Sequence, residues 1–462
     1  MKSLVLAEKP SVARDIARVL GCHKNISGAI EGSNYIVTWA LGHLVTLADP
    51  EEYDKKFKTW DMSYLPMVPE KWELVVIKQT SKQYHNVKTQ LFRKDISEII
   101  IATDAGREGE LVARWILDKS GCYKPIKRLW ISSVTDKAIK EGFAHLKDGR
   151  AYNDLYHAAR SRAEADWLVG INATRALTCK YNAQLSCGRV QTPTLAMIAH
   201  REQQIRSFKP EDYYGLRCTT TVTAGSAGTT ASLVTWTWQQ KKSGSLRSFN
   251  KDLISGLDKK LKNQTLTVTD VHTSSKRTPS PGLYDLTELQ RDANKRFGFS
   301  AKETLNIMQS LYEHHKVLTY PRTDSRYIGT DIVPTIKERL KACNIGPYKK
   351  YIPELLKKPV KTSKAFVDDK KVNDHHAIIP TEEYVQMEHM TNNERKIYDL
   401  VVRRFISVLY PAFEYEQTTL RAEAAGETFT AKGKVIKAAG WKAVYSDAAS
   451  SGSSASQYDT YG

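Results

Sequence analysis

The sequence has few of the features typical of a secreted protein, a zinc-binding protein or a membrane protein. It contains six cysteines but no C-x-x-C pair, and only Cys179 and Cys187 lie near each other. This spacing argues against a zinc ribbon and a disulfide framework, and it fits a reducing cytoplasm. No apolar run reaches the ~18 residues of a membrane span, and the first five residues read as a strand rather than a signal peptide. We therefore expect a soluble, cytoplasmic protein without a membrane partner.

Acidic residues are also in deficit. The chain has 51 Asp and Glu against 69 Lys and Arg, which gives a formal net charge of +18. Such a surplus indicates a polyanionic partner, usually nucleic acid, although a solvated basic surface without a partner remains the alternative. The phosphate loop G-x-x-x-x-G-K-[ST] is missing, so no ATP site is expected. At 462 residues, the chain is too long for one ordinary core, and several domains are expected.

The hydrophobic pattern divides the chain into successive parts. Strands are expected at residues 4–7, 99–102 and 129–131, each followed by a helical pattern, which predicts an α/β domain with a largely parallel sheet over residues 1–145. A helical, arginine-rich part follows over residues 146–211. Alternating runs over 212–275 predict antiparallel sheet. Strand-like segments at 415–421 and 429–435, within residues 391–445, predict a return to that sheet, and the Ser/Ala/Gly-rich residues 446–462 predict a flexible tail.

Residues 276–390 are predicted to form another helical domain. A capping box from Ser300 to Glu303 opens a helix that leads into a short strand ending at Tyr320. Lysines are frequent after this strand, between Lys349 and Lys371. They fit a solvated face and a DNA-proximal surface about equally well.

Tyr320 lies in the run LTYPRTDSR at residues 318–326. A phenol attacks a phosphodiester poorly unless nearby groups neutralise the phosphate and steady the phenolate. Arg322 and Arg326 could do both, because a guanidinium pairs bidentately with phosphate oxygens. Taken alone, the run favours a buried structural tyrosine at a strand end, with a nucleophile as the alternative.

Carboxylates follow two of the predicted strands. Glu8 ends the first strand in the run AEKPS at residues 7–11, and Asp104 and Glu108 follow the second in TDAGREGE at residues 103–110. Strand-end loops at the carboxyl edge of a parallel sheet commonly gather functional sites. Three carboxylates from two such loops could hold Mg²⁺, which prefers oxygen ligands. A single acidic residue after a strand is more often a helix cap, but two clusters together favour the metal site.

These clusters resemble a Toprim domain, and together with the Tyr320 run they resemble a bacterial type IA DNA topoisomerase of the topoisomerase III subgroup. The runs SCGRVQTPTL at residues 186–195 and HHAIIPT at 375–381 match the same family. The resemblance extends from residue 3 to about residue 445. It implies a multidomain α/β plus α+β fold with toroidal architecture: a Toprim domain, a helical DNA-binding part, a β-rich arch, and a helical domain carrying the tyrosine.

The resemblance also implies a mechanism. Tyr320 would attack single-stranded DNA and form a 5′-phosphotyrosyl link, which conserves bond energy for religation. Arg322 would hold the scissile phosphate, and Lys9 would stabilise it or protonate the leaving oxygen. Glu8 would serve as acid, base and metal ligand, and His375 matches the active-site histidine. The implied partners are single-stranded and negatively supercoiled DNA, acted on by a nucleoid-associated monomer that relaxes or decatenates it with Mg²⁺.

Further matches concern DNA contacts. The loop that the resemblance implies to touch the strand consists of Ser186, Cys187, Gly188, Arg189, Val190 and Gln191. In it, Gly188 would let the backbone approach and Arg189 would reach phosphate. Trp60, Trp167 and Arg175 also match DNA-contacting positions. An indole can stack on an unpaired base, but core packing is the alternative for each tryptophan.

The chain departs from the family pattern in two places. Gly106 replaces the middle aspartate of the usual D-x-D-x-E motif, which leaves Glu8 and Asp104, with Glu108 as a third candidate, for one metal ion. Relatives also continue past residues 440–445 with a helical segment, so the chain reads as C-terminally shortened. Two other classes therefore stay open: a Toprim nuclease or primase, and a non-catalytic single-strand binding protein.

Overall fold

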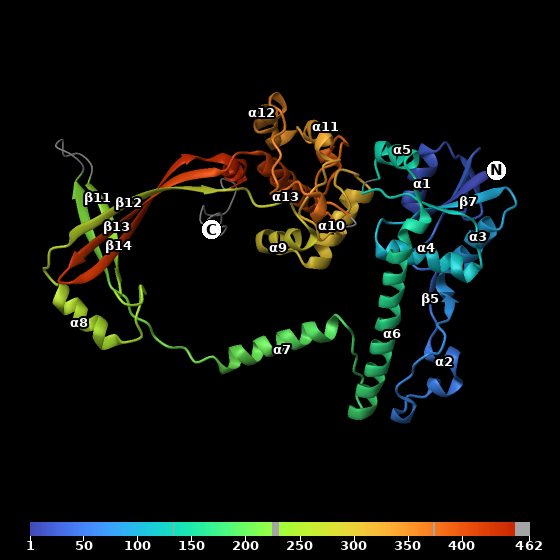
Figure 1. Cartoon of the computed structure of the whole chain (residues 1–462), viewed down its shortest axis with the longest axis horizontal. Helices are drawn as coiled ribbons and strands as arrows, with labels where there is room; N and C mark the ends of the chain where they lie inside the picture. The colour runs from blue at the N-terminus through green and yellow to red at the C-terminus, as the bar shows by residue number, and fades with distance from the viewer. Residues whose placement is uncertain (133, 224–230, 373–374, 449–462) are drawn as a thin grey trace. The chain divides into compact units, whose positions relative to one another are not determined.

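The computed structural model describes residues 1–132, 134–223, 231–372 and 375–448. The chain divides into two compact units (Figure 1). The first contains residues 1–199 and 282–409, and the second contains residues 200–281 and 410–462. This division is coarser than the six predicted parts, and it assigns residues 391–409, which were predicted to belong with the β-rich region, to the first unit. The finer domain boundaries stay predictions.

A seven-stranded sheet forms the base of the first unit, in the order β2-β3-β4-β1-β7-β8-β9. The central strands β4, β1, β7 and β8 pair in parallel, and short antiparallel strands close both edges. The strand bounds are β1 Lys2–Ala7, β2 Lys24–Ile26, β3 Ala29–Glu31, β4 Tyr35–Trp39, β7 Ile96–Ala102, β8 Ile126–Arg128 and β9 Lys147–Asp148. This arrangement confirms the prediction of an α/β region with a largely parallel sheet.

Helices cover both faces of this sheet because its central strands are apolar on both sides. Leu4 and Leu6 of β1 face a core shared with α3 (Ser81–Leu91) and α4 (Arg107–Ser120). Val5 and Ala7 face the opposite core, shared with α1 (Pro10–Val19) and α5 (Asp136–Ala144). The alternation along β1 thus builds two cores and leaves its carboxyl end, at Glu8, on the sheet edge.

The predicted strand at residues 129–131 is wrong. Pairing with β7 ends at Arg128, and Leu129 is the last residue to donate to that strand, to the Ile101 carbonyl at 2.9 Å. The apolar run was mistaken for the strand because the paired residues include charged Lys127 and Arg128. Residues 129–131 instead lead from the sheet toward Ser132, which contacts the segment around Tyr320.

Two helices follow the sheet, as predicted for this part of the chain. They are α6 (Asn153–Tyr181), which packs on the sheet's core through Tyr156 and Ala159, and α7 (Gln191–Ser207), which has no buried residue. Between β4 and α3 lie the hairpin of β5 (Val45–Leu47) and β6 (Leu74–Val76) and the short α2 (Pro50–Tyr53). None of the helices in the described residues is long and apolar enough to span a membrane.

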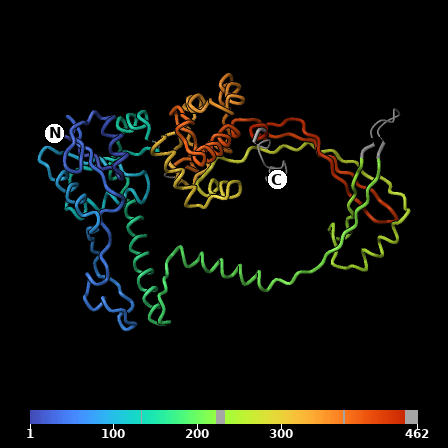
Figure 2. The backbone as a smooth tube through the Cα atoms, turned by 180° about the vertical axis from the view of Figure 1, so that it is seen from behind, coloured from blue at the N-terminus to red at the C-terminus, as the bar shows by residue number. Residues whose placement is uncertain are grey.

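The remainder of the first unit is helical and lies beside the sheet in both backbone views (Figures 1 and 2). Ser300 caps α10 by accepting a bond from the Glu303 N–H at 3.1 Å, as the capping box predicts. The predicted strand at Tyr320 is reduced to one bridge between Leu318 and Pro380. Pro321 has no N–H, so the ladder cannot continue past Tyr320. The helices are α9 Leu286–Phe297, α10 Ala301–Glu313, α11 Ile336–Ala342, α12 Ile352–Lys357 and α13 Asn392–Leu409.

The second unit is built on an antiparallel sheet of order β10-β11-β14-β13-β12, which confirms the predicted β-rich region and the return strands. The bounds are β10 Arg217–Thr223, β11 Ala231–Gln239, β12 Thr267–Thr278, β13 Phe413–Ala424 and β14 Glu427–Ala438. The prediction missed α8 (Lys251–Leu261), which Asn250 caps and which packs Ile254 and Leu257 on Trp236 and Trp238. Most of the predicted tail, from residue 449, lies outside the described residues.

Candidate active site

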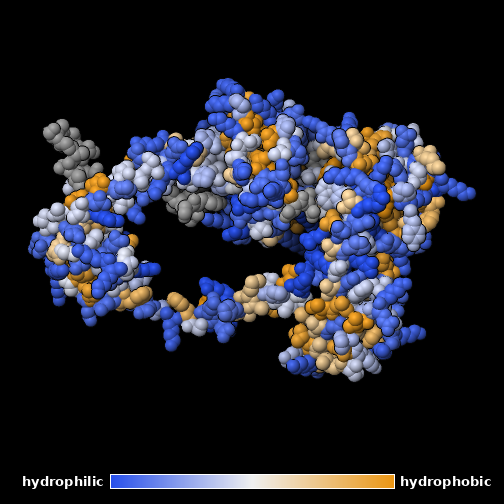
Figure 3. All heavy atoms as spheres, in the orientation of Figure 1, coloured by the Kyte–Doolittle hydropathy of each residue, from blue (hydrophilic) through white to orange (hydrophobic). Residues whose placement is uncertain are grey.

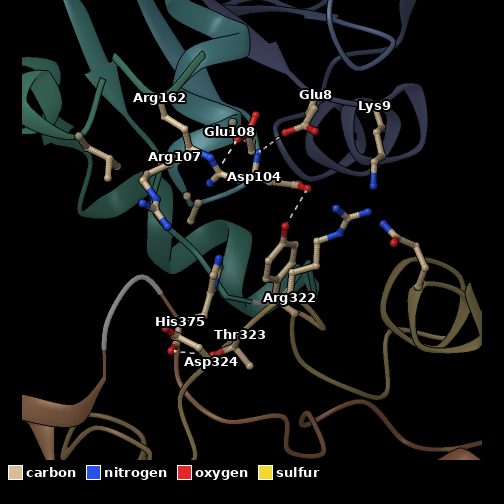
Figure 4. Close-up of a pocket in the computed structure, with 16 residues that line it drawn as sticks. Glu8, Lys9, Asp104, Arg107, Glu108, Arg162, Arg322, Thr323, Asp324 and His375 are labelled. Atoms are coloured by element: carbon tan, nitrogen blue, oxygen red, sulfur yellow. Dashed lines mark hydrogen bonds and ion pairs between the residues drawn. The ribbon is translucent and has the colours of Figure 1, made fainter. Parts of the chain in front are cut away.

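The carboxyl edge of the parallel sheet and the segment around Tyr320 enclose a cavity of about 620 Å³. Figure 4 shows side chains from both sides of it. The cavity gathers all five predicted catalytic residues, which are Glu8, Lys9, Tyr320, Arg322 and His375, and two further predicted metal ligands, Asp104 and Glu108. Residues more than 300 positions apart in the sequence therefore share one space.

Glu8 and Asp104 form a close carboxylate pair. They follow the adjacent parallel strands β1 and β7, in which Ala7 and Ala102 are register partners. The Asp104 N–H donates to Glu8 Oε2 at 3.1 Å. Burial and the neighbouring Asp104 charge raise the pKa of Glu8 to about 7, and burial also raises the pKa of Asp104. Glu8 is thus near half-protonated at neutral pH, the condition that suits a general acid or base.

Arg128 holds the loop that carries Asp104 through its backbone carbonyls. The sequence analysis did not identify this arginine. The fully buried guanidinium donates to the carbonyls of Thr103 and Asp104, both at 2.8 Å, and pairs with Glu110 Oε2 at 2.9 Å. Two fixed carbonyls leave the loop little freedom, so Arg128 positions the Asp104 carboxylate without touching the cavity. The sequence offered one signal for this role: Arg128 ends β8, and β8 pairs with β7, the strand that precedes Asp104.

Tyr320 is held by its backbone and by two contacts of its ring. Its N–H donates to the Ser132 carbonyl at 3.1 Å, and its hydroxyl donates to Asp104 Oδ2 at a long 3.5 Å. The ring stacks on His375 with centroids 4.2 Å apart and meets the edge of Tyr312 at 5.5 Å. Burial and the charges of Asp104 and Glu8 raise the pKa of Tyr320 well above its usual value. The phenol is therefore protonated at neutral pH in this state.

Of the two adjacent histidines, only His375 lines the cavity. Its Nδ1 lies 3.2 Å from Ser132 Oγ, and its buried Nε2 has no hydrogen-bond partner among the described residues. Burial, aided by His376, lowers the pKa of His375 to about 3, so the ring is neutral at pH 7. His376 is buried with its Nδ1 2.7 Å from the Ala377 carbonyl.

The cations of the site differ in how they are held. Lys9 Nζ pairs with Glu313 Oε1 at 2.5 Å, and Gln309 donates to the same oxygen at 2.7 Å. No hydrogen bond or ion pair with another described residue holds Arg322, and Figure 4 shows it pointing into the cavity beside Asp104. Arg326 does not line the cavity; it donates to the Leu283 carbonyl at 3.1 Å. The sequence analysis missed Glu313, whose only signal was its place one turn after Gln309 on α10.

Glu108 does not join the carboxylate pair. Its side chain is 63% exposed and lies 3.8 Å from His43 Nε2 and 3.9 Å from a nitrogen of Arg162. Within residues 1–448 as described, no group of three His, Cys, Asp or Glu side chains could hold a metal ion. Glu8 and Asp104 alone still suit Mg²⁺, which often takes one or two carboxylates and completes its shell with water and phosphate. A divalent cation would also relieve the repulsion between them.

The predicted DNA-contacting loop joins α6 to α7 and does not line the cavity. Thr174 Oγ1 accepts from the Cys187 N–H at 2.9 Å, and Thr192 Oγ1 accepts from the Gly188 N–H at 3.0 Å. Arg189 pairs with Asp166 at 2.6 Å. Ser186, Val190 and Gln191 are exposed. Threonines of α6 and α7 thus hold the loop at the neighbouring residues Cys187 and Gly188, while Ser186, Val190 and Gln191 face solvent.

Trp60, Trp167 and Arg175 also lie outside the cavity. Trp60 is 48% exposed, and the Arg175 guanidinium lies 5.0 Å from the centre of its ring. Arg175 is buried and donates to the Phe57 carbonyl. Trp167 donates to the Ala48 carbonyl at 2.9 Å and packs edge-on against Trp72 at 5.3 Å. Only Trp60 presents an open ring face, whereas Trp167 is part of the packing.

Comparison with known proteins gives a consistent picture. The sequence model of the DNA topoisomerase family matches residues 150–459, and that of the Toprim domain matches residues 3–134. The chain is 64% identical to DNA topoisomerase 3 of Bacillus cereus (strain ATCC 14579) and 60% identical to that of Bacillus subtilis (strain 168), in each case over 96% of its length. It spans only 59% and 60% of those relatives.

The fold agrees with this comparison. The structure of full-length topoisomerase I from Thermotoga maritima is similar at a TM-score of 0.67 and 23% identity, over 96% of this chain and 67% of that one. The family match covers well over half of the chain, and the Toprim match covers the sheet that carries Glu8 and Asp104. The chain therefore belongs to the type IA DNA topoisomerase family and carries a Toprim domain.

Proposed function

We propose that this chain cleaves single-stranded DNA through Tyr320, passes another strand through the break and rejoins the ends. Tyr320 Oη bonds to phosphorus, the bond to the 3′ oxygen breaks, and that oxygen leaves as a hydroxyl after taking up a proton. The phosphotyrosyl ester at the 5′ end conserves the energy of the broken bond, so religation needs no ATP. Repeated cycles would relax negative supercoils and separate linked DNA in the cell. A monomer would be sufficient because one chain supplies all five predicted catalytic residues.

One observation carries this proposal: the Tyr320 hydroxyl lies 3.5 Å from Asp104 Oδ2 in a cavity that Arg322 also lines. A nucleophile, a proton acceptor and a guanidinium therefore face one space that is large enough for a nucleotide phosphate. A structural tyrosine would require none of these neighbours. This arrangement supports a role in phosphoryl transfer, in which positioning and charge stabilisation do most of the work.

Proton movements can be assigned to the chain's own groups. The Tyr320 proton must leave during attack, and Asp104 Oδ2 is the acceptor that its hydroxyl already contacts. Glu8, with its pKa raised to about 7, can hold the proton that the 3′ oxygen needs or remove it for religation. Arg322 would pair with the scissile phosphate, and Lys9 would join it after exchanging its contact with Glu313 for a phosphate oxygen.

His375 would act as a neutral hydrogen-bond donor. When the Ser132 hydroxyl donates to Nδ1, the ring hydrogen resides on Nε2, which has no partner among the described residues. A neutral imidazole can thus give one hydrogen bond to a phosphate oxygen beside the Tyr320 ring on which it stacks.

Glu8 and Asp104 would hold Mg²⁺, with Glu108 joining them only after a change of rotamer. When bound, the ion would supply positive charge next to the phosphate and offset the repulsion between the two carboxylates. The carboxylate donors and their raised pKa values support this assignment.

DNA would be held outside the cavity by the loop from Ser186 to Gln191 and by Trp60. The exposed Trp60 face can stack on an unpaired base, a contact worth about 1–3 kcal/mol. Arg189 would exchange Asp166 for a phosphate. Arg175 would contribute by supporting one side of the Trp60 ring, and Trp167 would contribute through its packing against Trp72.

The test is a covalent-adduct assay. A single-stranded oligonucleotide labelled at its 3′ end is incubated with the chain and Mg²⁺, denatured, and analysed for label attached to protein. We expect an adduct with the unaltered chain, none with Tyr320→Phe, and an undiminished amount with the matched control Tyr327→Phe. An adduct in Tyr320→Phe contradicts the proposal. Binding without an adduct would indicate a single-strand binding protein, and free cut ends would indicate a Toprim nuclease.

A further inference from the structure

A strongly basic segment lies between Tyr320 and His375 in the sequence, outside the cavity that both line. This segment, the lysine lobe, is defined as residues 341–364 and has one acidic residue, Glu354. Glu354 pairs with Lys357 at 2.9 Å, so most of the positive charge has no acidic neighbour within the lobe. Its seven lysines all have exposed side chains, at Lys341, Lys349, Lys350, Lys357, Lys358, Lys361 and Lys364.

The lysine lobe is a folded surface rather than a loose tail. Three side chains within the lobe, those of Tyr348, Tyr351 and Ile352, are buried. Phe366, two residues after the lobe, is buried as well. Tyr348 also donates to Asp399 of α13 at 3.0 Å. The lobe contains the end of α11 and all of α12, which both lie at the upper edge of the view in Figure 1, and that edge is largely hydrophilic in Figure 3. Lys341, Lys349, Lys350 and Lys357 are therefore presented from helical backbone, and Lys358, Lys361 and Lys364 follow between α12 and the buried Phe366.

The residues directly after the lobe are bonded to the chain just after the tyrosine. Ile328 donates to the Phe366 carbonyl at 2.8 Å and accepts from the Asp368 N–H at 3.1 Å. Ser325 Oγ donates to the Lys371 carbonyl at 2.8 Å. A polyanion held on the lobe would therefore be fixed to the same rigid element that carries Tyr320 and Arg322.

From these observations we infer that the lysine lobe binds the phosphate backbone of duplex DNA. Lysine ammonium groups contact phosphates as point charges and read no base. Surfaces that hold single strands add aromatic stacking platforms, whereas Tyr348 and Tyr351 of the lobe are buried. A duplex hides its bases and presents one phosphate charge per ~1.7 Å of its axis, which suits a surface of lysines alone.

The inference rests on the proposed function, because it assigns the duplex flanking the single-stranded cleavage site to the lobe. Tyr320 and its neighbours would hold the unpaired strand, and the lobe would hold the paired part of the same substrate. A substrate with a junction between single and double strand would then engage both surfaces at once.

The test measures how binding depends on salt. The triple variant Lys358→Gln, Lys361→Gln and Lys364→Gln is compared with the unaltered chain on a 20-base-pair blunt duplex and a ten-nucleotide single strand. Equilibrium dissociation constants are measured between 50 and 200 mM KCl. A matched control, Lys82→Gln, Lys88→Gln and Lys94→Gln, removes the same charge from exposed lysines on and just after α3.

We expect the slope of log affinity against log salt for the duplex to fall by about 2.7, from three lost phosphate contacts at about 0.9 each. The slope for the single strand should fall by less than one, and the control should change neither. An equal loss in the control would overturn the inference, because net charge alone would then explain it. An equal loss on the single strand, or an unchanged duplex slope, would overturn it as well.

Failure of this inference can be told apart from failure of the proposed function. The duplex measurement involves no cleavage and does not depend on Tyr320, whereas the adduct assay uses a short single strand and Tyr320→Phe. A chain that forms the adduct but keeps its duplex slope in the lobe variant would refute the lobe alone. A chain that forms no adduct but loses the duplex slope in the lobe variant would refute the proposed cleavage through Tyr320 alone.

Discussion

Replacing Arg128 with methionine should destabilise the first unit substantially. The side chain is fully buried, so its loss leaves the buried Glu110 carboxylate with one partner, Arg114, at 2.9 Å. Breaking a buried ion pair typically costs 3–5 kcal/mol, and the remaining Arg114 contact favours the lower end. The carbonyls of Thr103 and Asp104 each lose a charged donor, which adds about 1 kcal/mol apiece. We expect a total loss of roughly 5 kcal/mol.

The assay is urea unfolding of the full chain followed by tryptophan fluorescence, because Trp130 lies against the Arg128 guanidinium with 5.0 Å to its ring centre. The double variant Arg128→Met and Glu110→Met removes both charges and should be less destabilised than Arg128→Met by about 2 kcal/mol. Arg128→Lys keeps the charge but has fewer hydrogen-bond donors. Its free energy of unfolding should lie between that of Arg128→Met and that of the double variant. A loss below about 1 kcal/mol in Arg128→Met, or a double variant less stable than the single one, would refute the reasoning.

Two further predictions concern pH and local stability. The raised pKa of Glu8 means that folding disfavours its ionised form, so without Mg²⁺ its contribution to stability falls as pH rises from 4.5 to about 7. Glu8→Gln should therefore stabilise the chain by about 3 kcal/mol at pH 8 and by little at pH 4 in urea unfolding with EDTA, and an equal gain at both pH values would contradict the assignment. Helix α7 has no buried residue, and an isolated helix of this length is marginal in water. Its amides should exchange with deuterium within seconds, whereas those of β1 and β7 stay protected; slow exchange in α7 would show that something covers it.

The sequence predicted the parts of the site that depend on local pattern. Glu8 and Asp104 could be paired in advance because each follows an apolar strand, and parallel strands bring their carboxyl ends to one edge. Glu108 could not be placed in this way. It starts a helix, and its partners His43 and Arg162 come from elements whose packing no local pattern reveals.

Errors in the elements have a similar origin. Of the apolar residues after Arg128, Leu129 is buried and Trp130 and Ile131 are half-buried, but none belongs to the strand, so an apolar run alone does not identify a strand. Helix α8 was missed because the residues around it alternate like strands. Its apolar residues Ile254 and Leu257 are explained only by their packing on two tryptophans in the folded structure. The contact between Lys9 and Glu313 joins residues 304 positions apart, and neither residue carries a signal for the other.

Ser132 connects the sheet side of the cavity to both rings on the other side. Its carbonyl accepts from the Tyr320 backbone, and its hydroxyl lies 3.2 Å from His375 Nδ1. If the sheet and the tyrosine segment moved apart, the contacts of the Ser132 hydroxyl and carbonyl would break, and Tyr320 and His375 would lose this support together. The carboxylate pair of Glu8 and Asp104 would then lie on one part and the protonated phenol of Tyr320 on the other, so the proposed reaction could not take place. Ser132 would thus couple the two sides of the cavity, because in the proposed reaction DNA could be cleaved or rejoined only while the sheet and the tyrosine segment are in contact.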